Sequence, residues 1–344
     1  MWLLERHTVP LVSCRLVVPS GAASDPPGKA GLAYLTANML DEGAGSRGAI
    51  ELSRALDDLG AHLETDASAD ASSVSLTVLA SRLAEAFALF ADMVARPRLE
   101  AKELARVRAI WANELAERAK DPDATSRVVF RAALFGPLHP YGHPWDGTPR
   151  SARAITLDDV RRFHRDEWRL DRATIACAGD VSRERLTSLL DQGFGAWKPP
   201  PAPASAPVKA PPAVGPWPRL VLVDRPDAPQ SVVAVVRPGL EVTSPDYPAM
   251  WRVNEAIGGD FASRLNEDLR EQRGLTYGAS SLYSTSRGPG LVVAWADVET
   301  GKTGEALRAM LADLHQFAAG GLSEDEIARS RSQARAALVG AYES

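Results

Sequence analysis

The sequence has few cysteines, few aromatic residues and no excess of positive charge. Of its 344 residues only two are cysteines, 6% are aromatic, and the formal net charge at pH 7 is -5. A chain without a basic stripe is a poor partner for nucleic acid or for an anionic membrane surface. The two cysteines, Cys14 and Cys177, lie in apolar strand-like runs, and we expect them to be buried core thiols.

Long apolar runs are also missing. No stretch approaches the roughly 20 apolar residues that a membrane span requires. The first residues, Met-Trp-Leu-Leu-Glu-Arg-His, lack the basic head, the apolar stretch and the small-residue cleavage site of a secretory signal. We therefore expect a soluble protein, and the sequence leaves its compartment open between cytoplasm and periplasm.

The remaining composition is that of an ordinary globular protein, with 45% apolar and 24% charged residues. The length allows two domains, each large enough to bury its own core. Residues 198–218 hold nine of the 25 prolines and no apolar periodicity, which is typical of an extended linker. This pattern predicts an N-terminal domain over 1–197 and a C-terminal domain over 219–344.

The two halves show signs of an internal duplication. Glu103 and Arg106 correspond to Glu326 and Arg329 at a constant offset of 223 residues, within similar helical runs. Several such pairs in one order favour a repeat over chance. Projecting the first half onto the second also predicts a loop, a helix, a strand and a further helix after Ser344, so we expect the chain to be truncated at its C-terminus.

Hydrophobic periodicity predicts an α+β fold. Strands are expected at about 11–19, 62–79 (a hairpin), 172–178, 219–224, 230–236, 275–286 and 290–298. Helices are expected at about 28–42, 48–59, 81–95, 100–119, 182–192, 246–258, 261–271, 302–318 and 323–341, and another begins near residue 157 after a loop. Strands that neighbour in sequence, with helices to one side, indicate a mostly antiparallel sheet covered by helices in each domain.

The most informative stretch runs from Gly258 to Tyr277. A Gly-Gly hinge, an amphipathic helix and a Gly-led strand place a cation, Arg273, and the Tyr277 phenol at a strand start. This stretch closely resembles the C-terminal-half signature of the pitrilysin/insulinase family, the inverzincin peptidases that include mitochondrial processing peptidase. The resemblance implies that both side chains bind the substrate or its oxyanion. The alternative is an Arg273 paired with acids such as Glu267 or Glu271.

The matching place in the first half lacks the zinc motif of that family. In H-x-x-E-H, two His one turn apart bind zinc and the Glu acts as general base. Here Tyr34 and Asn38 stand at the His positions and Ala37 at the Glu position, and the family's spacing puts Glu114 at the third-ligand position. A phenol, a methyl group and a carboxamide do not make a tight zinc site. We therefore expect this chain to bind no metal cofactor.

The former zinc positions also have ordinary interpretations. Tyr34 and Asn38, one helical turn apart, are expected to pack and hydrogen-bond across the former metal cavity. Glu114 is expected to be a solvated or ion-paired helix residue. The pair His139 and His143 is interrupted by prolines, which favours a structural loop over a metal site.

The resemblance covers nearly the whole chain and implies two tandem homologous domains, forming half of a processing-peptidase-like clamshell. It also implies a non-catalytic subunit of a zinc metallopeptidase pair. In the family's two-chain members one polypeptide carries the zinc and the general base, and its sister supplies the Arg/Tyr pair. The implied partners are thus a zinc-bearing sister subunit with an intact H-x-x-E-H motif, together with a peptide substrate.

The alternative is a structural or assembly subunit of the same fold, as in the family's respiratory-complex core subunits. An autonomous peptidase is disfavoured because no other set of His, Cys and Glu has ligand spacing.

Overall fold

The structure of the chain is a computed structural model, and it describes residues 1–198 and 220–342. The described residues form two compact units. Unit 1 comprises residues 1–118 and the chain from 143 to the undescribed segment, and unit 2 comprises residues 119–142 and the chain after that segment. Apart from Lys198, the proline-rich stretch 198–218 expected as a linker lies outside the described residues.

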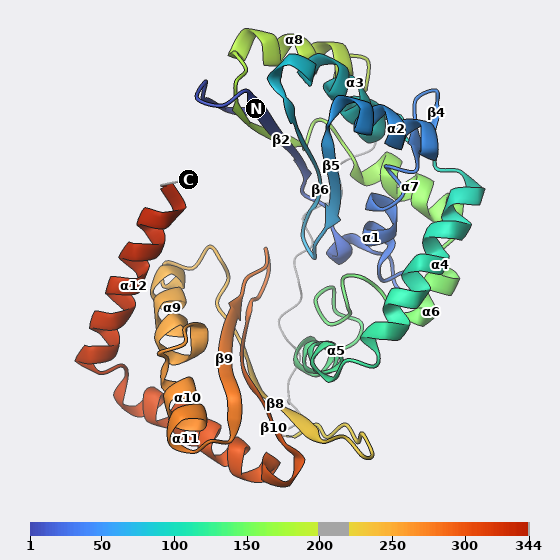
Figure 1. Cartoon of the computed structure of the whole chain (residues 1–344). Helices are drawn as coiled ribbons and strands as arrows, with labels where there is room; N and C mark the ends of the chain where they lie inside the picture. The colour runs from blue at the N-terminus through green and yellow to red at the C-terminus, as the bar shows by residue number, and fades with distance from the viewer. Residues whose placement is uncertain (199–219, 343–344) are drawn as a thin grey trace. The chain divides into compact units, whose positions relative to one another are not determined.

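Unit 1 is built on a five-stranded sheet with the strand order β1-β7-β2-β6-β5 (Figure 1). Its strands are β1 (Trp2–Glu5), β2 (Leu11–Val18), β5 (His62–Ala67), β6 (Ser72–Leu79) and β7 (Thr174–Gly179). All neighbouring strands are antiparallel except β1 and β7, which are parallel. Buried and exposed residues alternate along β2, so that Val12, Cys14, Leu16 and Val18 face the core. The predicted mostly antiparallel sheet is confirmed.

Helices pack on the buried face of this sheet and against one another. They are α1 (Leu32–Ala37), α2 (Ala49–Leu59), α3 (Leu83–Ala95), α4 (Ala101–Arg118), α6 (Pro149–Ala154), α7 (Leu157–Glu167) and α8 (Arg183–Phe194), and a short hairpin joins β3 (Gly43–Ala44) to β4 (Arg47–Gly48). The rings of Phe87 and Phe90 of α3 lie 6.1 and 6.2 Å from the ring of Phe194 of α8, between centroids. This aromatic cluster joins the two helices within one core.

Cys14 and Cys177 lie directly opposite each other on β2 and β7 and form a disulfide, with their Cα atoms 4.1 Å apart. The prediction of buried core thiols is therefore wrong about their chemical state, although both residues are buried. The sequence could not pair them because 163 residues separate them and only the sheet makes them neighbours.

The first helix is shorter than the predicted span of 28–42. Gly31, just before α1, has a φ of 85°, in the left-handed region that ends a regular helix. It has no room for a side chain, because a Cβ there would lie 2.7 Å from the Trp111 ring. At the other end, the Asn38 amide donates to the Tyr34 carbonyl (2.8 Å) and so competes with the helical hydrogen bonds.

Unit 2 contains a three-stranded antiparallel sheet with the order β8-β10-β9. Its strands are β8 (Gln230–Pro238), β9 (Thr276–Ser284) and β10 (Leu291–Glu299). On one side of the sheet lie α9 (Tyr247–Asn254), α10 (Arg264–Asn266), α11 (Thr303–Gly320) and α12 (Glu324–Tyr342) (Figure 1). π-Helical turns over Glu255–Gly259 and Glu267–Gln272 continue α9 and α10. The core of this unit includes Leu265, Leu269, Val298 and Met310.

Two predictions of local structure are wrong. The described part of the predicted strand 219–224 is not a strand, since no described strand lies beside it and Leu220 and Leu222 are exposed. Residues 122–135, assigned to a loop, form α5 (Pro122–Phe135), which lies against β8 in unit 2. The Asp121 carboxylate accepts the Asp123 N–H (2.9 Å) and Pro122 occupies the first helical position. The Asp-Pro pair therefore starts a helix rather than a turn.

The repeated glutamates take equivalent places in the two units. Glu103 in the first turn of α4 and Glu326 in the first turn of α12 are each 8% exposed. Glu103 accepts a hydrogen bond from Arg106 (3.1 Å) within its own helix. Glu326 instead accepts two hydrogen bonds from Arg264 (2.7 and 2.6 Å), which ties α12 to α10.

Within residues 1–198 and 220–342, no helix combines the length and the apolar character needed to cross a membrane.

Replacing Glu326 by glutamine should lower the free energy of unfolding of unit 2 by about 3 kcal/mol at neutral pH, because it leaves Arg264 without its counter-charge. The bonds from Arg264 lower the pKa of Glu326 to about 2. A carboxyl whose pKa is lowered by folding adds stability above its unfolded pKa and loses that contribution as the pH falls. In urea denaturation, the difference between wild type and Glu326→Gln should therefore shrink from about pH 5 towards about pH 2.

The control is Glu324→Gln, which changes an exposed glutamate in the same turn of α12. It should alter stability by less than about 0.5 kcal/mol. If the Glu326→Gln difference did not depend on pH, the ion pair would not be the cause of the stability change.

Reduction of the Cys14–Cys177 bond should lower the stability of unit 1 by about 2–5 kcal/mol, because the bond closes a long loop of the unfolded chain. Thermal unfolding with and without a reductant measures the change. A Cys14→Ala, Cys177→Ala double variant should be equally destabilised and should not respond to the reductant. Alkylation of both cysteines in the denatured, unreduced chain would contradict the pairing.

Candidate functional site

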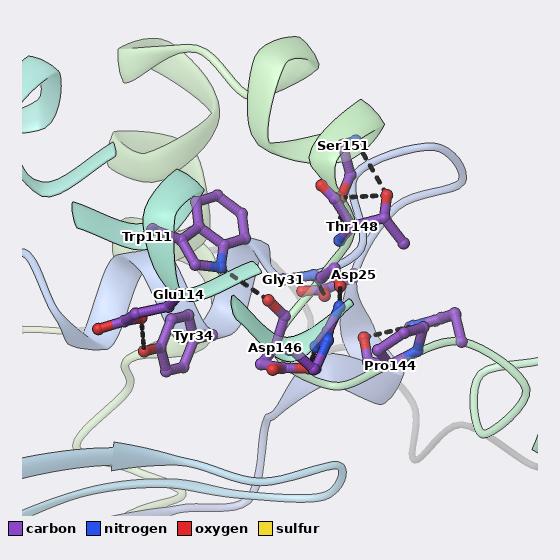
Figure 2. Close-up of polar contacts among 12 residues, drawn as sticks. Asp25, Gly31, Tyr34, Trp111, Glu114, Pro144, Asp146, Thr148 and Ser151 are labelled. Carbon is purple, nitrogen blue, oxygen red and sulfur yellow. Dashed lines mark hydrogen bonds and ion pairs between the residues drawn. The ribbon is translucent and has the colours of Figure 1, made fainter. Parts of the chain in front are cut away.

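Tyr34 and Ala37 lie on α1 and Asn38 follows its last residue, and the Tyr34 side chain points to Glu114 of α4 (Figure 2). The Tyr34 hydroxyl donates a hydrogen bond to Glu114 Oε2 at 3.0 Å. Ala37 is buried, with 1% of its surface exposed, and faces the core of unit 1. The Asn38 amide is turned to its own helix, where it donates to the Tyr34 carbonyl. The sequence-predicted residues are thus brought together, but they bond to one another.

Two tryptophan side chains and an ion pair lie around this hydrogen bond. The Tyr34 ring lies 6.0 Å from the Trp111 ring and 5.6 Å from the Trp145 ring, which it meets edge-on. The Trp111 indole N–H donates to the Asp146 carbonyl at 2.8 Å, and the Asp146 carboxylate pairs with Arg118. These bonds hold the segment that carries Trp145 against α4.

The N-terminal end of α1 is fixed by a carboxylate. Asp25 accepts the backbone N–H groups of Gly31 (2.7 Å), Leu32 (3.2 Å) and Ala33 (2.9 Å) (Figure 2). Burial raises the pKa of Asp25 to about 8, while the three N–H donors act in the opposite direction. These three bonds satisfy orphan donors at the helix start.

Tyr34 stays protonated over the whole physiological range. Burial, followed by the hydrogen bond to Glu114, raises the pKa of Tyr34 to about 12. The neighbouring charges of Glu114 and Asp146 act in the same direction. The side chain is therefore a hydroxyl donor at neutral pH.

This arrangement does not fit a zinc ion. The phenol is committed to Glu114, the amide to the helix backbone, and Ala37 offers no donor atom. In the described parts of the chain, no group of three or more His, Cys, Asp and Glu side chains is arranged to hold a metal ion. A tetrahedral zinc site needs at least three such protein ligands. His139 and His143 follow the irregular path that their prolines predict.

Arg273 lies at the end of the π-helical turn that continues α10. Its Nε donates to Asp268 Oδ2 at 2.7 Å, so the acid beside it is Asp268 and not Glu267 or Glu271. This bond raises the pKa of Arg273 above its ordinary value. The Nη groups have no acceptor within hydrogen-bond distance among the described residues, and they remain available to a ligand.

Tyr277 projects from a β-bulge at the start of β9. The register with β10 shifts there, so that Tyr277 and Gly278 both lie opposite Asp297. The Thr276 hydroxyl accepts the Gly278 N–H at 3.1 Å and lies 2.7 Å from the Asp297 carbonyl, which holds the bulge. Bulges of this kind re-aim a side chain. The Tyr277 side chain is 93% exposed.

The two groups of residues belong to different units: Tyr34 and Glu114 to unit 1, Arg273 and Tyr277 to unit 2. Sequence reasoning missed Trp145 and Asp146 beside Tyr34. The one signal in the sequence was the run Pro-Trp-Asp-Gly after His143, in which a tryptophan precedes an Asp-Gly pair. In the structure this tryptophan is exposed. Nothing in that run indicates that it lies beside α1.

The chain is similar in sequence to bacterial proteins that are described as zinc proteases or as a non-peptidase homolog. An uncharacterized zinc protease of Mycobacterium tuberculosis is 29% identical over 313 residues, which are 90% of this chain and 70% of the relative. The non-peptidase homolog YmxG of Helicobacter pylori is 23% identical over 274 residues, which are 79% of this chain and 62% of the relative.

The fold is shared with solved structures. The crystal structure of a peptidase M16 inactive domain from Pseudomonas fluorescens matches with a TM-score of 0.87 and 24% identity, over 98% of this chain and 81% of that chain. The family described as insulinase (peptidase family M16) matches residues 1–136, and the one described as peptidase M16 inactive domain matches residues 154–334. The resemblance and the predicted pair of homologous domains are confirmed. The chain belongs to the M16 (insulinase) peptidase family.

Proposed function

We propose that this chain is a non-catalytic subunit that binds a peptide and acts with a zinc-bearing sister subunit of the same family. One observation carries the proposal: the Tyr34 hydroxyl bonds to Glu114, the Asn38 amide bonds to its own helix and Ala37 offers no donor atom, so that Glu114 is left as a single carboxylate, too few ligands for a catalytic metal ion. The non-catalytic role is also supported by two descriptions: one matching family, over residues 154–334, is described as an inactive domain, and one relative is described as a non-peptidase homolog.

The substrate-binding role is assigned to Arg273 and Tyr277. The Nη groups of Arg273 would donate to a peptide carbonyl or to a terminal carboxylate, with Asp268 holding the guanidinium by its Nε. The exposed Tyr277 hydroxyl would donate to the oxygen that becomes negatively charged as the peptide bond is attacked. Fixed donors of this kind favour the transition state over the substrate.

The partner is proposed to be a sister chain with an intact H-x-x-E-H motif, and that chain would supply the metal chemistry. Such a pair divides peptide binding and bond cleavage between two polypeptides. The residues of this chain then affect the rate only through the peptide that they hold.

The isolated wild-type chain should bind no stoichiometric zinc. A Tyr34→His, Ala37→Glu, Asn38→His triple variant should gain about one tightly bound zinc, because it restores two imidazole ligands one helical turn apart near Glu114. Equilibrium dialysis with metal analysis measures both. Circular dichroism checks that the variant folds, since position 37 is buried. Stoichiometric zinc in the wild-type chain would overturn the non-catalytic role.

Arg273→Ala should lower kcat/KM of the mixed subunits on an unstructured peptide by about 100-fold, because the charged donor that positions the peptide is lost. Tyr277→Phe removes only the hydroxyl and should have an effect of similar size. The control is Arg329→Ala, an exposed arginine on α12. The proposal fails if Arg273→Ala mixed with the wild-type sister cleaves at the full rate.

A further inference from the structure

The aromatic groups around Tyr34 form a corner with one carboxylate at its edge. The planes of the Tyr34 and Trp145 rings lie at 75° to each other, with centroids 5.6 Å apart, so they form two walls. Glu114 lies at the hydroxyl end of one wall. Trp145 is 43% exposed and Glu114 is exposed, so a ligand can reach both.

This corner carries unbalanced negative charge. Asp146 is neutralised by Arg118. Glu114 has no cation within ion-pair distance among the described residues, and its hydrogen bond comes from the neutral Tyr34 hydroxyl. Two carboxylates and only one guanidinium therefore lie close to the Tyr34 ring.

The corner is also held in place before any ligand arrives. Trp111, which is 2% exposed, backs the Tyr34 ring and anchors the Asp146 carbonyl by its indole N–H. Asp146 directly follows Trp145, and its carboxylate pairs with Arg118. A rigid aromatic corner loses little conformational entropy when it binds a ligand.

From these observations we propose that Tyr34, Trp145 and Glu114 bind the cationic side chain of a lysine or arginine in a peptide. Ammonium and guanidinium groups are attracted to the faces of tyrosine and tryptophan and, at short range, to a carboxylate. The position that binds zinc in the intact motif would thus be a subsite for a positively charged residue. The inference rests on the proposed function for its peptide ligand, and it names the class of peptide that this chain selects.

The test compares two unstructured, fluorescently labelled peptides that differ only at one position, where one has arginine and the other has citrulline, its neutral isostere. Fluorescence anisotropy with the isolated wild-type chain should give about 10-fold tighter binding of the arginine peptide. Added salt should reduce the difference, because an exposed carboxylate contributes to it. No sister subunit and no cleavage are needed, so failure here is separable from failure of the proposed subunit role.

Variants identify the residues responsible. Glu114→Gln and Trp145→Ala should each remove most of the preference, whereas Tyr34→Phe should keep or increase it, since the ring stays and Glu114 is released from the hydroxyl. Glu184→Gln on α8 and Trp2→Ala on β1 change an exposed carboxylate and an exposed indole elsewhere in unit 1 and should leave the preference unchanged. Equal affinity for the two peptides, no binding of either, or a preference that survives both Glu114→Gln and Trp145→Ala would overturn the proposal.

Discussion

The hydrogen bond between Tyr34 and Glu114 joins the two helices that carry the zinc-motif positions. It spans 3.0 Å between α1 and α4 and needs only a neutral donor and a carboxylate. The helix that provides the donor is short, and its start is held by the Asp25 side chain and by the close approach of Gly31 to Trp111. Once this geometry is fixed, the neighbouring indoles and Asp146 have defined places. The geometry around the zinc-motif positions is therefore fixed by the chain's own side chains.

The chemistry of this site differs from that of an intact H-x-x-E-H motif. Two imidazoles and a carboxylate would form a basic, metal-binding set, whereas a phenol with a pKa of about 12 and a lone carboxylate form a hydrogen-bonded pair with residual negative charge. Aromatic walls beside such a charge suit an organic cation better than a zinc ion. In the proposed function, a site that has lost the ability to cleave a peptide keeps a means of holding one.

Unit 2 repeats the architecture of unit 1 but places its exposed functional groups differently. A β-bulge turns Tyr277 outward, and Asp268 holds Arg273 by one edge of its guanidinium. The repeated glutamates show the same divergence: Glu103 bonds within its own helix, and Glu326 joins two helices through Arg264. The glutamate is thus buried in both units, while its arginine partner lies in the same helix in one unit and in another helix in the other. Buried positions are constrained by packing from many sides, and surface positions are constrained by few contacts.

The sequence by itself determined the α+β class, most of the elements, the repeat and the loss of the zinc donors at Tyr34, Ala37 and Asn38. These features depend on residue type and on spacing along the chain, which can be read locally. Tertiary structure alone decided that Cys14 pairs with Cys177, that α5 lies in the second unit and that Trp145 stands beside Tyr34. In the first and the last case, more than a hundred residues separate the two partners. Such contacts arise from how strands and helices pack, and no local pattern encodes them.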